Sequence, residues 1–246
     1  MGQGTNSKIE VYEHFMNATA DSYVDVAQAI GTQGVMCVGI GALTFVGVVD
    51  EPGGIQSITT DTTDNNNAAL YIGPFMAKDG GVWMETRLKV DAIDDLALFV
   101  GFTEILAYDT PVMPAEFATE SFVYSSTGSI LGLQYDLDAT TGDWRACATN
   151  DQSYSIDCDS DATRANNPPV ADKFDVLRVE VEPNGNGSCW LGTDAGALKL
   201  VKRFTTTPVE TDVVLFATVM VENRANAAAV LEVDYFNAGG NIDWTQ

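Results

Sequence analysis

The stretch Val82-Trp83-Met84-Glu85-Thr86-Arg87-Leu88-Lys89-Val90 decides the fold class, because its side chains alternate between apolar and polar. The apolar side chains fall on one face and the charged ones on the other, with Val82, Met84, Leu88 and Val90 opposite Glu85, Arg87 and Lys89. A repeat of two residues is typical of a β-strand, since successive side chains of a strand point to opposite faces. We therefore predict a strand with one buried face.

The same alternation recurs in two later stretches. In Leu177-Arg178-Val179-Glu180-Val181-Glu182 the apolar side chains are predicted to face inward, and near the C-terminus so are those of Leu231, Val233 and Tyr235. Two other runs, residues 96–102 and 213–221, are apolar on both faces. Such runs suit central strands that are covered on both sides, or strands whose outer face meets a partner subunit.

Turn signals separate the predicted strands. The glycine-rich segment 183–187 predicts a hairpin, segment 223–229 is expected to link two strands in the same way, and Gly39–Gly41 is expected to bend between two strands. Short helices are predicted only at Val24–Ile30 and Pro114–Ser121. The sequence thus predicts an all-β, two-sheet antiparallel sandwich with at most one or two short helices.

Length and charge limit the number of domains and the class of partner. The 246 residues show no break in composition, so we expect one sandwich domain over residues 8–246 and a flexible N-terminal arm over residues 1–7. The 35 acidic and 12 basic residues give a net charge of −23, which repels phosphate and anionic lipid. Lys199, Lys202 and Arg203 are the densest basic group, which we interpret as a chance cluster on a solvated strand. We predict neither nucleic-acid nor membrane binding.

The N-terminal residues do not resemble a secretory signal, because Met1–Ser7 has neither a basic nor an apolar region. The most apolar segment, residues 34–49, is shorter than the roughly 20 residues that a membrane-spanning helix needs. We therefore expect the protein to stay in the cytoplasm in which it is made.

The cysteines do not form a recognisable zinc site or disulfide framework. Cys37, Cys147, Cys158 and Cys189 contain no closely spaced pair, and His14 is the one histidine. Residues 144–149 and 154–158 are predicted to form a hairpin, which would bring Cys147 near Cys158. Two reduced thiols are the favoured interpretation, and a disulfide is the alternative in oxidising surroundings.

Acidic residues cluster at two places. Asp157, Asp159 and Asp161 are spaced as in a calcium loop, but the glycine and the glutamate that an EF-hand needs are replaced by Ala162 and Pro168. A solvated acidic loop is therefore favoured over a looser calcium site. A second group, Asp136, Asp138 and Asp143, is interpreted as part of a hairpin turn. We predict no metal site and no cofactor.

No complete catalytic set is found in the sequence. His14 is predicted to share one face of a strand with Tyr12, and no serine lies in a nucleophile elbow. The segment 232–237 is similar to the E-x-D-x-x-E pattern of lichenase-like sandwich glucanases, with Glu232 and Asp234 in place. Asn237 replaces the acid/base residue, so the proton donor is missing. We therefore assign no catalytic residue and predict that the protein is not an enzyme.

The order of the strand-like segments carries a family resemblance. These segments are Tyr12-Glu13-His14-Phe15, Ala69-Leu70-Tyr71-Ile72, Trp83–Lys89, Phe99–Thr103, Gly132–Asp136, Asp175–Val181 and Leu231–Phe236. Over about residues 8 to 240 they resemble the concanavalin A-like sandwich domains found among structural proteins of tailed bacteriophages. The resemblance implies a jelly-roll sandwich located in a virion. It further implies a capsid decoration (cement) protein that binds the major capsid protein as a homo-oligomer and has no cofactor.

Two other functions remain open. The first is a carbohydrate-binding module on the head or tail surface, for which Trp144, Trp190 and Tyr154 are the candidate aromatic residues. Core packing is the competing explanation for these side chains. The second is a divergent sandwich glycosidase that uses Glu232.

Overall fold

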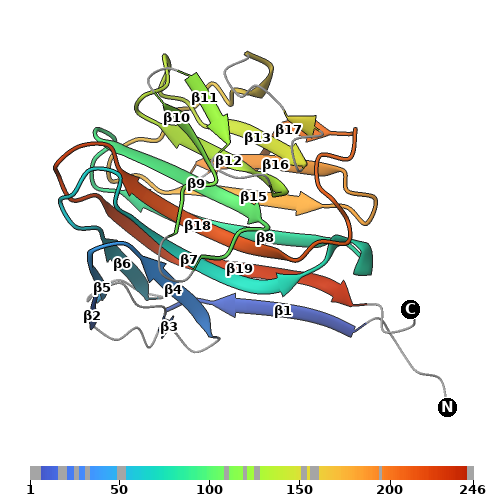
Figure 1. Cartoon of the computed structure of the whole chain (residues 1–246), viewed down its shortest axis with the longest axis horizontal. Coiled ribbons are helices and arrows are strands. Elements are labelled where there is room, and N and C mark those ends of the chain that lie inside the picture. The colour runs from blue at the N-terminus through green and yellow to red at the C-terminus, as the bar shows by residue number, and fades with distance from the viewer. Residues whose placement is uncertain are drawn as a thin grey trace.

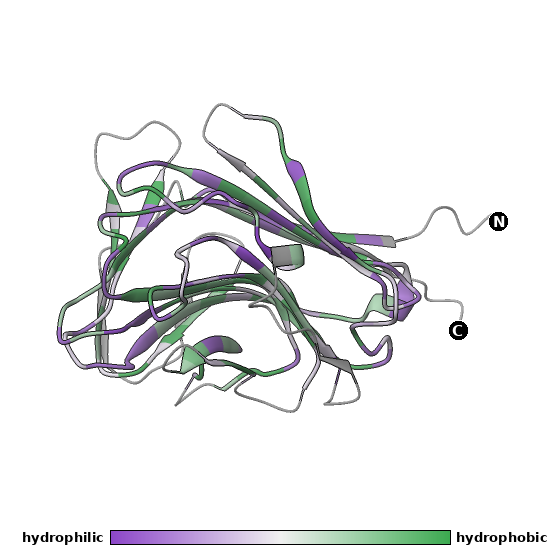
Figure 2. Cartoon of the chain, turned by 90° about the horizontal axis from the view of Figure 1, so that it is seen from above, coloured by the Kyte–Doolittle hydropathy of each residue, from purple (hydrophilic) through white to green (hydrophobic). Residues whose placement is uncertain are grey.

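Two large antiparallel sheets stack face to face in the computed structural model (Figures 1 and 2). The structure describes residues 7–15, 21–24, 28–30, 34–48, 54–107, 111–118, 121–124, 128–150, 154–155, 161–193 and 196–242. Within these ranges, no helix is both long and apolar enough to cross a membrane. The predicted all-β, antiparallel jelly-roll sandwich is confirmed.

The first sheet has nine strands in its described part, in the order β17-β16-β15-β8-β19-β6-β5-β2, and β1 also pairs with β19. Its strands are β1 (Ser7–Glu13), β2 (Asp21–Val24), β5 (Ala42–Val48), β6 (Ile55–Thr59), β8 (Val82–Val90), β15 (Asp175–Val181), β16 (Gly187–Thr193), β17 (Lys199–Phe204) and β19 (Val230–Ile242). We call this the nine-stranded sheet.

The second sheet has eight strands in its described part, in the order β14-β13-β12-β9-β18-β7-β4-β3. Its strands are β3 (Gln28–Ile30), β4 (Val35–Gly39), β7 (Asn67–Phe75), β9 (Leu96–Thr103), β12 (Ile130–Asp136), β13 (Arg145–Asn150), β14 (Tyr154–Ser155) and β18 (Leu215–Asn223). A separate hairpin of β10 (Ala115–Ala118) and β11 (Ser121–Tyr124) lies beside β12 (Figure 1).

Alternation in the sequence places the core between the sheets. In β8 every second residue is buried, beginning with Val82, and β15 follows the same pattern. Both strands are therefore confirmed as predicted. Their buried side chains pack against those of β9 and β18 from the opposite sheet, in one continuous apolar cluster.

The C-terminal strand departs from simple alternation. Leu231 and Val233 are buried as predicted, but Tyr235 is only half-buried and Phe236 is buried instead. The register against β8 shifts between Val233 and Tyr235, so Asp234 is an extra residue in a β-bulge. The inward prediction for Tyr235 is wrong because one extra residue moves every following side chain to the other face.

The strands that are apolar on both faces are covered on both faces by the chain itself. All eight residues of β9 are buried. Its inner face contributes to the core, while Ala97 and Phe99 on its outer face join a second apolar cluster with Met113 and Ala115. The sequence allowed either a central strand covered on both sides or a strand whose outer face meets a partner subunit. The first of these alternatives applies to β9.

Neither predicted helix forms in the described residues. Val24 ends β2 and Gln28–Ile30 is β3, while the segment 114–121 contains β10 and the first residue of β11. Ala115 and Phe117 are buried with Glu116 between them, so the segment follows the repeat of a strand and pairs with β11. The helical turns that the structure does contain in its described part are two 3-10 turns, at Ala77–Asp79 and Asp161–Thr163.

The three predicted turns differ in how well the structure agrees with them. The hairpin at residues 183–187 is confirmed, with Gly185 at a φ of 80° between β15 and β16. The bend at Gly39–Gly41 joins β4 and β5, which lie in different sheets, and Gly41 has a φ of 80°. Segment 223–229 links the strands β18 and β19 as predicted, but it crosses from one sheet to the other and is therefore not a hairpin turn.

The predicted N-terminal arm lies almost entirely outside the described residues. Residues 1–6 are not described, and Ser7 is the first residue of β1. Ser7 pairs with Ile242 at the end of β19.

Candidate functional site

A row of half-buried and exposed side chains crosses the outer face of the nine-stranded sheet. Each residue of the row is the cross-strand partner of the next one. In order across the sheet, the row consists of Tyr12, Asn237, Glu85, Arg178, Trp190 and Leu200. We call these six residues the outer row. Tyr12 is 47% exposed at one end and Leu200 is 54% exposed at the other. The sheet thus presents aromatic, polar and charged groups together on a face turned away from the core.

Trp83 lies beside the outer row, next to Gly239, which has no side chain. Glu10, Gly239, Trp83 and Glu180 are cross-strand neighbours in the adjacent row. A Cβ on Gly239 would lie 3.2 Å from Trp83 Nε1 and 2.8 Å from the backbone oxygen of Ile9. The missing side chain therefore leaves room for the indole to lie across β19 towards β1.

Two neighbours hold the Trp83 ring in place. The ring centroid of Tyr12 lies 6.1 Å from that of Trp83, with the planes inclined at 50°. The guanidinium carbon of Arg178 lies 5.1 Å from the centroid of the Trp83 ring, within the range of a cation–π contact. Tyr12, Trp83 and Arg178 form one continuous surface, which we call the Trp83 platform.

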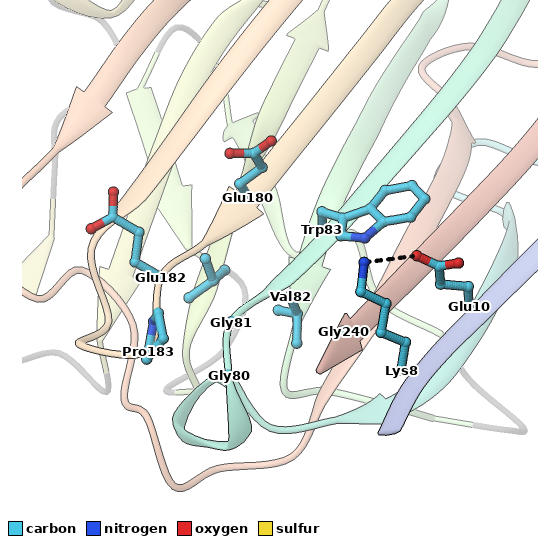
Figure 3. A pocket seen from close by; sticks show the side chains of 11 residues that line it. Lys8, Glu10, Gly80, Gly81, Val82, Trp83, Glu180, Glu182, Pro183 and Gly240 are labelled. Carbon is cyan, nitrogen blue, oxygen red and sulfur yellow. Dashed lines mark ion pairs between the residues drawn. The ribbon is translucent and has the colours of Figure 1, made fainter. Parts of the chain in front are cut away.

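A shallow pocket of about 270 Å³ adjoins this platform. Figure 3 shows its side chains, with the broad face of the Trp83 ring in view and Lys8 beside Glu10. Its lining residues are Lys8, Glu10, Gly80, Gly81, Val82, Trp83, Glu180, Val181, Glu182, Pro183 and Gly240. The pocket therefore combines one aromatic ring with three carboxylates and an ammonium group.

Each carboxylate of the pocket lies in an ion pair. Glu10 Oε1 lies 3.9 Å from Lys8 Nζ, Glu180 Oε1 accepts from Arg178 Nε at 2.7 Å, and Glu182 pairs with Arg203. Arg178 Nη1 also lies 3.1 Å from Glu85 Oε2. The surface is close to electrically balanced, so it suits a neutral polar molecule better than an ion. In the described part of the chain, no three His, Cys, Asp or Glu side chains are placed to hold a metal ion.

The glucanase-like residues of β19 are engaged by cations of β8. Glu232 Oε2 lies 2.9 Å from Lys89 Nζ, and Asp234 Oδ2 lies 2.6 Å from Arg87 Nη1. The Arg87 guanidinium is 3.7 Å from the centroid of the Phe174 ring. Asn237 belongs to the outer row. The arrangement is a ladder of ion pairs, in which neither carboxylate stands alone as an acid or a base.

The three aromatic candidates are placed differently. Trp190 lies in the outer row. Trp144 is fully buried and donates its Nε1 hydrogen to Asp175 Oδ2 at 2.9 Å, so its assignment as an exposed binding residue is wrong. Tyr154 lies in β14, but its side chain is outside the described part. Sequence reasoning missed Trp83 and Tyr12, although Trp83 stands on the polar side of the stretch that decides the fold.

The structure does not bring the remaining sequence candidates, which are a histidine, two cysteines and an acidic loop, together into one site. His14 is exposed just after β1, on the same side as Tyr12, and its ring centroid lies 6.0 Å from that of Tyr235. The hairpin of β13 and β14 is confirmed, and Cys147 is a buried free thiol. Cys158, Asp157 and Asp159 lie outside the described residues. The free thiol of Cys147 agrees with the favoured reduced state, and the calcium alternative stays a prediction.

Asp136 has a larger role than the predicted hairpin turn. It does accept from the backbone NH of Asp138 at 3.1 Å, as a turn residue would. It is also fully buried and accepts from the backbone NH of Phe117 at 2.8 Å and from Arg224 Nη2 at 2.6 Å. Arg224 further contacts Glu116 Oε2 at 3.1 Å and Glu222 Oε1 at 2.9 Å. This cluster of three carboxylates around one guanidinium fastens β10 to the eight-stranded sheet.

The cluster predicts a pH dependence of stability. Burial raises the pKa of Glu222 from 4.5 to about 7. The negative charges of Glu116 and Asp136 also raise this pKa, whereas the positive charge of Arg224 lowers it. Between these two pH values the unfolded chain loses this proton while the folded chain keeps it, so unfolding becomes easier as the pH rises. The Glu222→Gln variant is expected to be more stable than the wild type at pH 8 by about 2 kcal/mol and equally stable near pH 4. Urea denaturation at both pH values measures this, and an equal stability of the two proteins at pH 8 would contradict it.

Comparison with known proteins supports the fold alone. No family model matches the sequence, and no curated protein matches it. Peanut lectin is similar in structure with a TM-score of 0.56 and 11% identity, over 97% of this chain and 100% of the lectin. A protein of unknown function from Shewanella oneidensis MR-1 has a TM-score of 0.55 and 12% identity, over 99% of this chain and 91% of that one. The Emp47p carbohydrate recognition domain has a TM-score of 0.51 and 14% identity, over 92% of this chain and 99% of that domain.

Proposed function

We propose that the protein is a non-catalytic carbohydrate-binding module that binds neutral sugars at the Trp83 platform. The observation that carries this proposal is the aromatic surface of Trp83 and Tyr12 beside a pocket whose carboxylates are all ion-paired. This combination joins an apolar surface to a dense set of polar groups at one place.

Sugars are recognised by both kinds of group. The C–H face of a pyranose ring is apolar and packs on an aromatic ring, while its hydroxyl groups donate to carboxylates and accept from guanidinium groups. Hydrogen bonds to charged groups are stronger than those between neutral groups. Glu180 and Arg178 already contact one another, so a sugar would meet a pair that is held in position before binding.

Two of the similar structures add support, since peanut lectin and the Emp47p domain are described as a lectin and a carbohydrate recognition domain. Their identity to this chain is too low to carry any binding residue across, so the proposed site comes from this chain's own geometry. The role of a capsid decoration protein, with its virion partners and homo-oligomer, stays a prediction. None of the similar structures named above is described as a virion protein.

The Trp83→Ala variant is expected to lower the affinity for a bound glycan about tenfold to a hundredfold, because it removes the aromatic surface. A glycan array with the wild-type protein identifies the ligand, and isothermal titration calorimetry measures both affinities. Val46→Ala is the matched control, since Val46 is an exposed apolar residue of β5 in the same sheet but outside the site. Unchanged affinity in the Trp83 variant, or no glycan bound by the wild type, would overturn the proposal.

A further inference from the structure

We infer that the ligand is a segment of an extended, linear, neutral polysaccharide that lies across the strands, along the outer row from Tyr12 to Trp190. This inference rests on the proposed function and adds the shape and length of the ligand. It follows from the register of five neighbouring strands and from the open form of the face that they build.

The register fixes the length of the binding surface. Tyr12 on β1 and Trp190 on β16 lie in the same row, with β19, β8 and β15 between them. Neighbouring strands are about 4.8 Å apart, so four spacings separate the two residues by roughly 19 Å. That length is close to two disaccharide units of an extended, β-linked chain of the cellulose or chitin type. A single sugar would cover only a small part of it.

The surface between the two ends is continuous. Tyr12 contacts Trp83, Arg178 stacks on Trp83, and Arg178 is the cross-strand neighbour of Trp190. Flat groups therefore succeed one another across the sheet, and a chain of sugar rings can pack on them in turn. The two carboxylates that flank Arg178 share this one cation, so one of their two negative charges is left uncompensated. An uncharged chain is thus favoured over an acidic one such as a uronate polymer, which Glu85 and Glu180 would repel.

The far end of the row is open. Beyond Trp190 the row continues to Leu200, which is 54% exposed on β17, the terminal strand of the nine-stranded sheet as described. An enclosed pocket selects the end of a glycan, whereas an open face accepts an internal segment and lets the chain run past it. The geometry therefore fits a polymer better than a terminal sugar.

Calorimetric titration with cellulose and chitin oligosaccharides, from the disaccharide to the hexasaccharide, tests the inference. Affinity is expected to rise with length up to about the tetrasaccharide, the length that fills four strand spacings, and then to level off. Trp190→Ala is expected to lower the affinity for the hexasaccharide about tenfold while leaving the disaccharide unchanged. If the alanine variant does not fold, Trp190→Leu replaces it in the test, because leucine keeps apolar bulk on β16. Val46→Ala is again the control.

The outcomes separate the inference from the proposed function. Equal affinity for the disaccharide and the hexasaccharide, or an unchanged hexasaccharide affinity in the Trp190 variant, overturns the extended-chain inference while the proposed function stands. A tighter affinity for uronate polymers than for neutral ones also overturns it. Failure of the wild type to bind any glycan, on the array or in solution, overturns the proposed function and the inference with it.

Discussion

Replacing Arg224 by methionine is expected to lower the free energy of unfolding by about 3–5 kcal/mol at pH 8. The Arg224 side chain is only 5% exposed and lies against Asp136, Glu116 and Glu222. Methionine fills similar space but leaves three buried or half-buried carboxylates without their shared cation. Removing one partner of a buried ion pair is costly because the remaining charge stays out of water. Urea denaturation followed by tryptophan fluorescence measures the loss.

An exposed arginine supplies the control for this experiment. Arg203 pairs with Glu182, but its side chain is 52% exposed, so Arg203→Met is expected to cost less than about 1 kcal/mol. The loss in the Arg224 variant is also expected to shrink at pH 5. Glu222 is then protonated in the folded protein and needs no cation. Wild-type stability of the Arg224 variant at pH 8 would show that the cluster does not hold β10 to the sheet.

Replacing Phe236 by alanine is expected to cost about 3–5 kcal/mol, whereas replacing Tyr235 by alanine is expected to cost about 1 kcal/mol. Phe236 is fully buried in the core between the sheets, so its loss leaves a cavity. Tyr235 is half-buried on the outer face, where its hydroxyl donates to Glu85 Oε1 at 2.9 Å. Adjacent residues therefore differ severalfold in their effect on stability.

Denaturant midpoints of the two variants, measured side by side, test the β-bulge at Asp234. Simple alternation along β19 would place Tyr235 in the core and Phe236 outside. A larger loss for Tyr235→Ala than for Phe236→Ala would therefore mean that the bulge is absent. Tyr235→Phe removes only the hydroxyl and separates the hydrogen bond to Glu85 from the packing of the ring.

Much of the fold could be predicted from short stretches. The alternation in residues 82–90 and 177–181 gives both strands and their buried faces, because the periodicity of side chains along a strand is a local property. The hairpin at residues 183–187 is equally local, since its glycines permit the turn. These features need no knowledge of any distant segment.

The errors arise where distant partners decide the outcome. The segment 114–121 has the local signals of a helix start, yet Phe117 donates its backbone NH to Asp136, which follows nineteen residues later. Arg224, more than a hundred residues away, pairs with Glu116. These partners, which are distant in the sequence, make β10 a strand. A local sequence pattern cannot predict such distant contacts.

The candidate site was predicted only in part, for the same reason. Trp190 and Trp144 both stand in strand-like segments, and composition does not distinguish them. Trp144, the residue before β13, is buried in the core, where Asp175 accepts its indole hydrogen, while the outer side of β16 presents Trp190. Trp83 could have been found, since it stands among charged residues on the polar face of its own strand.

The sequence by itself determined that this protein is built of strands, which faces of β8 and β15 are buried, and that its charge is strongly negative. The tertiary structure alone decided that Tyr12, Trp83, Arg178 and Trp190 form one surface. The physical reason is that a strand's periodicity depends on its own residues, whereas a row across a sheet depends on the register between strands. That register is set by the hydrogen bonds and packing of segments up to more than a hundred residues apart.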